Sequence, residues 1–243
     1  MAEITEYERR IAAEHAENPA ELKKMLERVE AGEMLAYIIG EWFFYRRYFK
    51  INRDCLIPRP DTERVVELAA DLLEKDGTLA DLCAGCGCIG LSLLDERPDC
   101  RCALLADISE GALAAAAENA ENFGFSSRVD IKKCDILVEN PLGAEKFSLI
   151  VSNPPYIPTS VVDESENLAA EPRAALDGGA DGLIFYRRIA DAFAENLKDG
   201  GAFIFEIGYD EADGIKSIAA ENGFDCKIFK DYSGNDRVAL LKR

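Results

Sequence analysis

The sequence has little histidine and tryptophan, one residue of each in 243, and it has no long apolar run. No stretch approaches the roughly 18 apolar residues of a transmembrane helix, so no membrane association is expected. The N-terminal residues lack the basic stretch and apolar core of a signal peptide, which predicts a cytoplasmic protein. Basic residues are also scarce: 28 Lys and Arg stand against 46 Asp and Glu, a net charge of −18. Direct binding of nucleic acid is therefore not expected, because it needs faces rich in Lys and Arg.

The shortage of histidine also bears on the eight cysteines. Cys83 and Cys86 have the spacing of a redox or metal motif, but no second such pair completes a four-ligand zinc set and His15 is far away in sequence. In the cytoplasm the cysteines are best interpreted as reduced thiols that pack as small hydrophobes. We expect no bound metal.

The pattern along the chain divides it into three parts. Residues 1–36 have the composition and apolar spacing of short helices, with a break at Asn18-Pro19. Residues 37–60 are aromatic and β-prone and then rich in proline, which predicts a hairpin followed by a linker. Residues 61–243 form the main domain, whose first helix is expected at 65–73 with Asp61 or Thr62 as its cap.

Short apolar runs and amphipathic stretches alternate through the main domain, which predicts an α/β fold with a doubly wound, Rossmann-like sheet. The last two strands are joined by residues 231–236 alone, too few for a parallel crossover, so one terminal strand is expected to be antiparallel. The sheet is then seven-stranded and mostly parallel. The expected strands are 78–83, 102–106, 129–133, 148–152, 202–207, 225–230 and 237–241, and the further helices are 89–94, 110–122, 183–196 and 211–222.

A glycine loop follows the first strand of this domain. Residues 85–90 match GxGxxG, and Asp107 closes the next strand, as in nicotinamide-dinucleotide sites. The same geometry serves any nucleoside whose ribose hydroxyls meet a carboxylate. Asp81, just ahead of the glycines, would repel a pyrophosphate but suits a ligand with an ammonium group, such as S-adenosylmethionine. The loop favours the methyl donor and leaves the dinucleotide open.

A second motif, Asn153-Pro154-Pro155-Tyr156, comes directly after an apolar strand. The prolines fix φ and lack N–H groups, so the carbonyls there are free to accept hydrogen bonds. The Asn153 side-chain oxygen and the Pro154 carbonyl could take both hydrogens of a planar NH₂ group, with Tyr156 on its flat face. Such binding would align a weakly nucleophilic nitrogen with a sulfonium methyl group. The four residues, Asn153, Pro154, Pro155 and Tyr156, are therefore the candidate catalytic residues.

Residues 37–243 resemble the N5-glutamine methyltransferases that modify peptide chain release factors. The resemblance rests on Leu56-Ile57-Pro58-Arg59-Pro60-Asp61-Thr62-Glu63, the glycine loop, the Asn-Pro-Pro-Tyr motif, Glu171-Pro172-Arg173, Glu206-Ile207-Gly208 and Asp236-Arg237-Val238. It implies a class I methyltransferase domain over residues 61–243, S-adenosylmethionine as cofactor, and the glutamine of a Gly-Gly-Gln loop on a release factor as substrate. The implied partner docks on residues 1–36, a region that is short for this family.

The resemblance also implies the cofactor site. The ribose would meet Asp107 and the adenine would meet Asp135 and Ile136. The full set of expected cofactor-binding residues is Asp81, Cys83, Ala84, Gly85, Cys86, Gly87, Asp107, Ile108, Asp135, Ile136 and Asn153. The sequence departs from the family pattern at Cys83, where a glycine is usual, and at Ile136, where some members have tryptophan.

Several alternatives stay open on the sequence alone. The glutamine could belong to a ribosomal protein, and adenine-N6 DNA methyltransferases use the same Asn-Pro-Pro-Tyr chemistry. An oxidoreductase would account for GxGxxG, and a binding module would need no chemistry at all. We expect a monomer, and a mobile lid over residues 157–181. The charge of −18 could steer the protein toward a basic partner.

Overall fold

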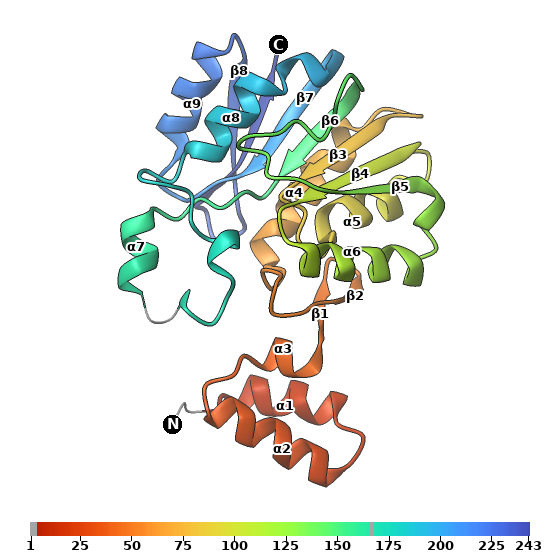
Figure 1. Cartoon of the computed structure of the whole chain (residues 1–243), viewed down its shortest axis with the longest axis vertical. Helices are drawn as coiled ribbons and strands as arrows, with labels where there is room; N and C mark the ends of the chain where they lie inside the picture. The colour runs from red at the N-terminus through yellow and green to blue at the C-terminus, as the bar shows by residue number, and fades with distance from the viewer. Residues whose placement is uncertain (1–3, 166–167) are drawn as a thin grey trace.

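The computed structural model describes residues 4–165 and 168–243 of the chain. Three helices lie at one end of the molecule, apart from the main sheet (Figure 1). Asn18 caps the second of them by accepting hydrogen bonds from the backbone of Ala20 and Glu21, and Pro19 is its first residue, so the predicted break is confirmed. The three helices share a small apolar cluster of their own. They are α1 (Glu6–His15), α2 (Pro19–Glu30) and α3 (Leu35–Ile39).

The predicted hairpin is present as β1 (Glu41–Phe44) and β2 (Arg47–Lys50). Its start was predicted wrongly, because residues 37–39 belong to α3. Gly40 ends that helix at φ 79°, a left-handed conformation that glycine adopts without strain, and the strand begins only after it. Phe44 and Phe49 are fully buried in the core of the main domain, so the hairpin is anchored to the sheet side of the molecule.

The main domain contains the predicted seven-stranded sheet, with strand order β5-β4-β3-β6-β7-β9-β8. β9 runs antiparallel to both of its neighbours and the other pairs are parallel, which confirms the expected antiparallel strand at the end of the chain. The order reverses between β3 and β6, where open α/β sheets bind their ligands. The strands are β3 (Thr78–Leu82), β4 (Cys102–Asp107), β5 (Val129–Lys133), β6 (Phe147–Ser152), β7 (Leu197–Glu206), β8 (Asp225–Lys230) and β9 (Asp236–Lys242).

Helices cover both faces of the sheet (Figure 1). Alternate strand residues point to opposite faces, so Leu79 and Ile204 belong to one apolar cluster while Ala80 and Phe203 belong to the other. The helices are α4 (Glu63–Leu72), α5 (Cys88–Glu96), α6 (Glu110–Asn122), α7 (Thr159–Glu164), α8 (Ile184–Ala192) and α9 (Ala212–Glu221), with short 3₁₀ turns at Pro60–Thr62, Ser126–Arg128, Arg173–Ala175 and Ala194–Asn196. None of the helices in the described ranges is long and apolar enough to cross a membrane.

The segment predicted to form a lid contains α7 and the turn at Arg173–Ala175. Ile157 and Asp177 form an isolated parallel bridge, and the Thr159 hydroxyl donates to Asp177 at 2.6 Å. Glu171 ties the segment to the proline-rich linker, because its carboxylate accepts from the Ile57 amide and from the Arg59 guanidinium. Residues 166–167 of this segment, like residues 1–3 of the N-terminal region, lie outside the described residues. Its mobility stays a prediction.

Candidate active site

A cavity of about 540 Å³ opens at the carboxyl ends of β3, β4, β5 and β6. The loops that follow these strands supply one part of its wall, and the proline-rich linker and the segment after α7 supply the other. Of the predicted site residues, those on the wall are Cys83, Ala84, Gly85, Cys86, Asp107, Ile108, Asp135, Ile136, Asn153 and Pro155. Asp81, Gly87, Pro154 and Tyr156 lie close by in sequence but not on the wall.

The glycine loop is held against the end of β4 by its backbone. The Gly85 amide donates to Asp107 Oδ2 and the Ser109 amide donates to Asp107 Oδ1, each at 2.8 Å. Gly85 has φ 57°, and Cys83 has φ 59° although it is not a glycine. Cys83 thus adopts a left-handed conformation that favours glycine, at a cost of about 1 kcal/mol.

Asp81 is fully buried beneath this loop. Its Oδ2 accepts from the Gly90 amide at 2.8 Å, near the start of α5, while Oδ1 has no hydrogen-bond partner among the described residues. Burial raises the pKa of this carboxyl to about 7, and the nearby Asp107 adds to the rise. Asp81 therefore organises the loop from below, and its predicted role toward a ligand's ammonium group stays a prediction.

The loop after β5 forms a mostly apolar part of the wall. Ile136 is buried, and the Leu137 amide donates to Asp135 Oδ1 at 3.0 Å, which fixes the turn. Ile108, from the loop after β4, is 49% exposed and available for contact. Apolar surface beside a carboxylate suits the base of a nucleoside.

The Asn-Pro-Pro-Tyr motif stands at the end of β6, as predicted. Asn153 Nδ2 donates to Thr62 Oγ1 at 3.4 Å, and no described residue donates to Asn153 Oδ1 or to the Pro154 carbonyl. Two hydrogen-bond acceptors without a donor thus follow the end of β6, and the first of them, Asn153, lies on the cavity wall. Tyr156 turns away instead, since its hydroxyl donates to Glu206 Oε1 at 3.4 Å and its ring packs against a core cluster. Its predicted stacking on a substrate stays a prediction.

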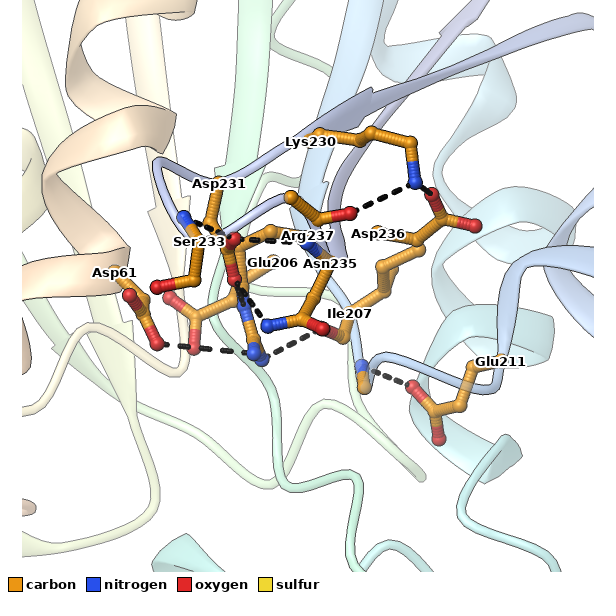
Figure 2. Close-up of polar contacts among 12 residues, drawn as sticks. Asp61, Glu206, Ile207, Glu211, Lys230, Asp231, Ser233, Asn235, Asp236 and Arg237 are labelled. Carbon is orange, nitrogen blue, oxygen red and sulfur yellow. Dashed lines mark hydrogen bonds and ion pairs between the residues drawn. The ribbon is translucent and has the colours of Figure 1, made fainter.

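Charged side chains gather where β7 ends and β9 begins (Figure 2). The Arg237 guanidinium donates to the Ile207 carbonyl at 3.1 Å and lies 3.7 Å from Asp61 and 3.5 Å from Asp231. Glu206 is 2% exposed, and burial raises its pKa to about 6 although the Thr62 hydroxyl and Arg237 oppose the rise. These charges hold the end of β7 beside Asn153.

Sequence reasoning missed several residues of the wall. Thr62 was expected to cap α4, but its side chain makes no capping hydrogen bond, and it is buried against the cavity. Arg173, from the 3₁₀ turn after α7, and Phe185, from α8, also line the cavity. The only sequence signal for Thr62 and Arg173 was that both lie in stretches that carry the family resemblance.

The buried carboxyls predict how stability depends on pH. Burial raises the pKa of Asp81 to about 7, of Glu206 to about 6 and of Glu211 to about 7, from ordinary values of 3.8, 4.5 and 4.5. At pH values between the ordinary and the raised pKa, these carboxyls are protonated in the folded chain and ionised in the unfolded chain. Their stabilising effect is complete below about pH 4 and is lost as the pH rises through about 6 to 7. Denaturant titrations should show that Asp81→Asn loses part of the decrease in the free energy of unfolding that the wild-type protein shows between about pH 4 and 7. Asp199 is exposed, so Asp199→Asn should show the same decrease in the free energy of unfolding as the wild-type protein. If the free energy of unfolding of Asp81→Asn depended on pH as in the wild-type protein, the raised pKa assigned to Asp81 would be wrong.

Gly178 allows the segment after α7 to approach the motif. A Cβ atom there would lie 2.7 Å from the Tyr156 Cα and 2.8 Å from the Pro155 carbonyl oxygen, and both are backbone atoms. Gly178→Ala should therefore displace the motif, costing about 1–3 kcal/mol of stability and lowering kcat by about tenfold. Gly77→Ala is the matched control, because its Cβ would lie 2.7 Å from the Glu74 carbonyl oxygen, away from the cavity wall. Equal kcat values for the two folded variants would refute the prediction.

Known proteins resemble this chain in sequence and in structure. Residues 64–199 match the family model of the methyltransferase small domain. Two of the relatives are named release factor glutamine methyltransferase. The protein from Caulobacter vibrioides is 41% identical, and the alignment covers 93% of this chain and 78% of that protein. The protein from Geobacter sulfurreducens is 39% identical, and the alignment covers 91% of this chain and 78% of that protein.

Solved structures share the fold. A ribosomal protein L11 methylase from Lactobacillus delbrueckii subsp. bulgaricus superposes with a TM-score of 0.58 at 21% identity, covering 83% of this chain and 91% of that one. An O-methyltransferase family protein from Burkholderia thailandensis gives a TM-score of 0.54 at 14% identity, over 76% and 56% of the two chains. At these identities the likeness extends to the methyltransferase fold alone.

Proposed function

The chain belongs to the release factor glutamine methyltransferase family, and we propose that it transfers a methyl group from S-adenosylmethionine to the side-chain nitrogen (N5) of the glutamine in the Gly-Gly-Gln motif of a release factor. The chain covers more than two thirds of those relatives. It is an S-adenosylmethionine-dependent methyltransferase, and the alternatives of oxidoreductase and binding module are set aside.

One observation carries the proposal for the substrate. Asn153 Oδ1 and the Pro154 carbonyl are acceptors without a donor among the described residues, they directly follow β6, and Asn153 lies on the cavity wall. A primary amide offers two hydrogens in one plane, which two such acceptors can hold together. Fixing both hydrogens orients the nitrogen toward the cofactor end of the cavity, and orientation is what a delocalised amide nitrogen needs.

The residues on the other part of the wall fit the methyl donor. S-adenosylmethionine, when bound, supplies a methyl group activated by a positively charged sulfonium. The wall carries the carboxylates of Asp107 and Asp135, and the buried Asp81 has an oxygen without a partner beneath the loop. This surplus of negative charge suits a cationic ligand. We propose that Asp107 binds the ribose hydroxyls, that Ile108, Asp135 and Ile136 hold the adenine, and that residues 83–87 hold the methionine part.

The remaining assignments concern the partner and its place in the cell. We propose that residues 1–36 form a docking region for the release factor, joined by the hairpin and linker of residues 37–60 to the catalytic domain of residues 61–243. The separate apolar cluster of α1–α3 supports this division. We further propose a cytoplasmic monomer that does not bind nucleic acid directly, consistent with the net charge of −18. That charge would speed association with a basic partner at low salt.

The direct test incubates the purified protein with S-adenosylmethionine labelled on its methyl group. One reaction contains a release factor and a second contains the same factor with its Gly-Gly-Gln glutamine replaced by alanine. The proposal predicts label in the first factor and none in the second. Equal labelling of both would refute it. In a third reaction with ribosomal proteins in place of the release factor, label there and none in the release factor would make a ribosomal protein the substrate.

A further inference from the structure

A turn of residues 135–139 follows β5 and forms the part of the cavity wall that is proposed to hold the adenine. Asp135, Ile136 and Leu137 lie on that wall. Within the turn, the Leu137 amide donates to Asp135 Oδ1 at 3.0 Å and the Glu139 amide donates to the Asp135 carbonyl at 2.9 Å. These hydrogen bonds shape the turn but do not connect it to another element of the fold.

Arg188, on α8, makes that connection. Its Nε donates to the Ile136 carbonyl at 2.9 Å and its Nη2 donates to the Glu139 carbonyl at 3.3 Å. No other described residue outside the turn forms a hydrogen bond with residues 135–139. We propose that Arg188 is a positioning residue, which holds this turn in the conformation that binds the adenine of S-adenosylmethionine. This inference rests on the proposed function, which places the adenine against Asp135 and Ile136.

The two hydrogen bonds of Arg188 hold the turn at two points. The guanidinium is planar and its N–H donors have a fixed spacing, so binding both carbonyls sets the position of Glu139 relative to Ile136. The Ile136 side chain is buried in an apolar cluster of the main domain, so this residue is held by its side chain and by its carbonyl. Without the guanidinium, the far end of the turn is held only by the hydrogen bonds within the turn.

The guanidinium of Arg188 is itself held in place. It lies over the ring of Phe193, 5.6 Å from the ring centroid, and Phe193 is fully buried. Arg188 forms no ion pair with a described residue, although the chain has 46 Asp and Glu. Its donors therefore serve the turn and are not shared with a carboxylate. Arg188 is absent from the described wall of the cavity, so it acts through the turn and not by touching the cofactor.

The preceding residue, Arg187, offers a matched control. It lies on the same helix but is exposed, and its Nη2 pairs with Asp181 at 2.5 Å. Replacing either arginine with methionine keeps an apolar stem and removes one positive charge, so the two variants change the long-range attraction of a cationic cofactor to a similar extent. Arg188→Met alone frees the turn. Arg188→Lys is a milder variant, which keeps the charge but lacks the planar pair of donors.

Calorimetry gives the Kd of S-adenosylmethionine, an NMR titration gives the Kd of adenosine, which lacks the methionine part, and thermal unfolding gives Tm. Arg188→Met should weaken binding of both ligands by about tenfold, the effect of a lost hydrogen bond to a charged group. Arg188→Lys should weaken both by at least about threefold, and Arg187→Met should stay within about twofold of wild type. The amides of residues 137–139 should exchange hydrogen faster in Arg188→Met than in Arg187→Met.

A lower Tm in Arg188→Met with wild-type Kd values, whether or not the amides exchange faster, would overturn the inference. Weaker binding of S-adenosylmethionine with unchanged binding of adenosine would also overturn it, because the lost contact would then not involve the adenine. If the wild-type protein binds S-adenosylmethionine but does not methylate release factors, the proposed function fails while the Kd values still test the inference. Methylation of a release factor by the wild-type protein, with unchanged Kd values in Arg188→Met and Arg188→Lys, would refute the inference alone.

Discussion

Replacing Asn153 with alanine is expected to lower kcat by about 10²- to 10³-fold, the loss typical when a group that orients or stabilises the reacting atoms is removed. Asn153 supplies one of two acceptors for the substrate amide, and the Pro154 carbonyl cannot hold both hydrogens alone. The substrate would bind with its nitrogen free to rotate away from the methyl group. The loss is expected in kcat, because the orientation of the nitrogen matters most when its bond to the methyl group forms.

The measurement is single-turnover methylation of a release factor together with calorimetric binding of S-adenosylmethionine. Asn153 lies at the edge of the cofactor part of the wall, so the Kd should change by less than about tenfold. Asn122→Ala, at the exposed end of α6, is the control and should match wild type in both measurements. If Asn153→Ala kept more than a tenth of the wild-type kcat, the proposed role of the side chain would be wrong.

Asp107→Ala should weaken binding of S-adenosylmethionine by about 2–3 kcal/mol, or about 30- to 150-fold in Kd. Two effects combine in this loss. The carboxylate fixes the glycine loop by accepting from the Gly85 and Ser109 amides at 2.8 Å, and each oxygen retains a lone pair for a ribose hydroxyl. Removing it frees the loop and leaves the ribose without an acceptor.

Calorimetry and the KM for S-adenosylmethionine both report this change. Asp130→Ala is a suitable control, because Asp130 is an exposed residue of β5, the strand beside β4, and does not line the cavity. We expect its Kd to equal the wild-type value. An Asp107→Ala variant that binds within about threefold of wild type would show that the ribose is held elsewhere.

Most of the fold could be predicted because the local sequence patterns favour the same strands that pair in the sheet. Residues 129–133 and 225–230 were assigned to strands with their observed bounds, since they are short β-prone runs between turn signals. The hairpin start failed at residues 37–39, where an aromatic and β-branched run forms α3 instead. Packing of α3 against α1 and α2 outweighs the local β propensity there.

The parts of the candidate site that could be predicted are those in which one short motif, directly after a strand, fixes the local backbone. The glycine loop and the Asn-Pro-Pro-Tyr motif each follow a strand, and parallel neighbouring strands bring their ends to one edge. The orientation of Tyr156 toward Glu206 could not be predicted, nor could the burial of Asp81, because both depend on contacts with distant segments. Thr62 was missed for the same reason: a capping position explained it locally, whereas its hydrogen-bond partner Asn153 is far away in sequence, directly after β6.

The most direct measurement is mass spectrometry of a release factor co-produced with this protein. The account predicts one added methyl group on the glutamine of the Gly-Gly-Gln motif with the wild-type chain, and a smaller methylated fraction with Asn153→Ala. A glutamine that stays unmodified in the presence of the folded wild-type chain, or a methyl group found on another residue of the factor, would contradict it.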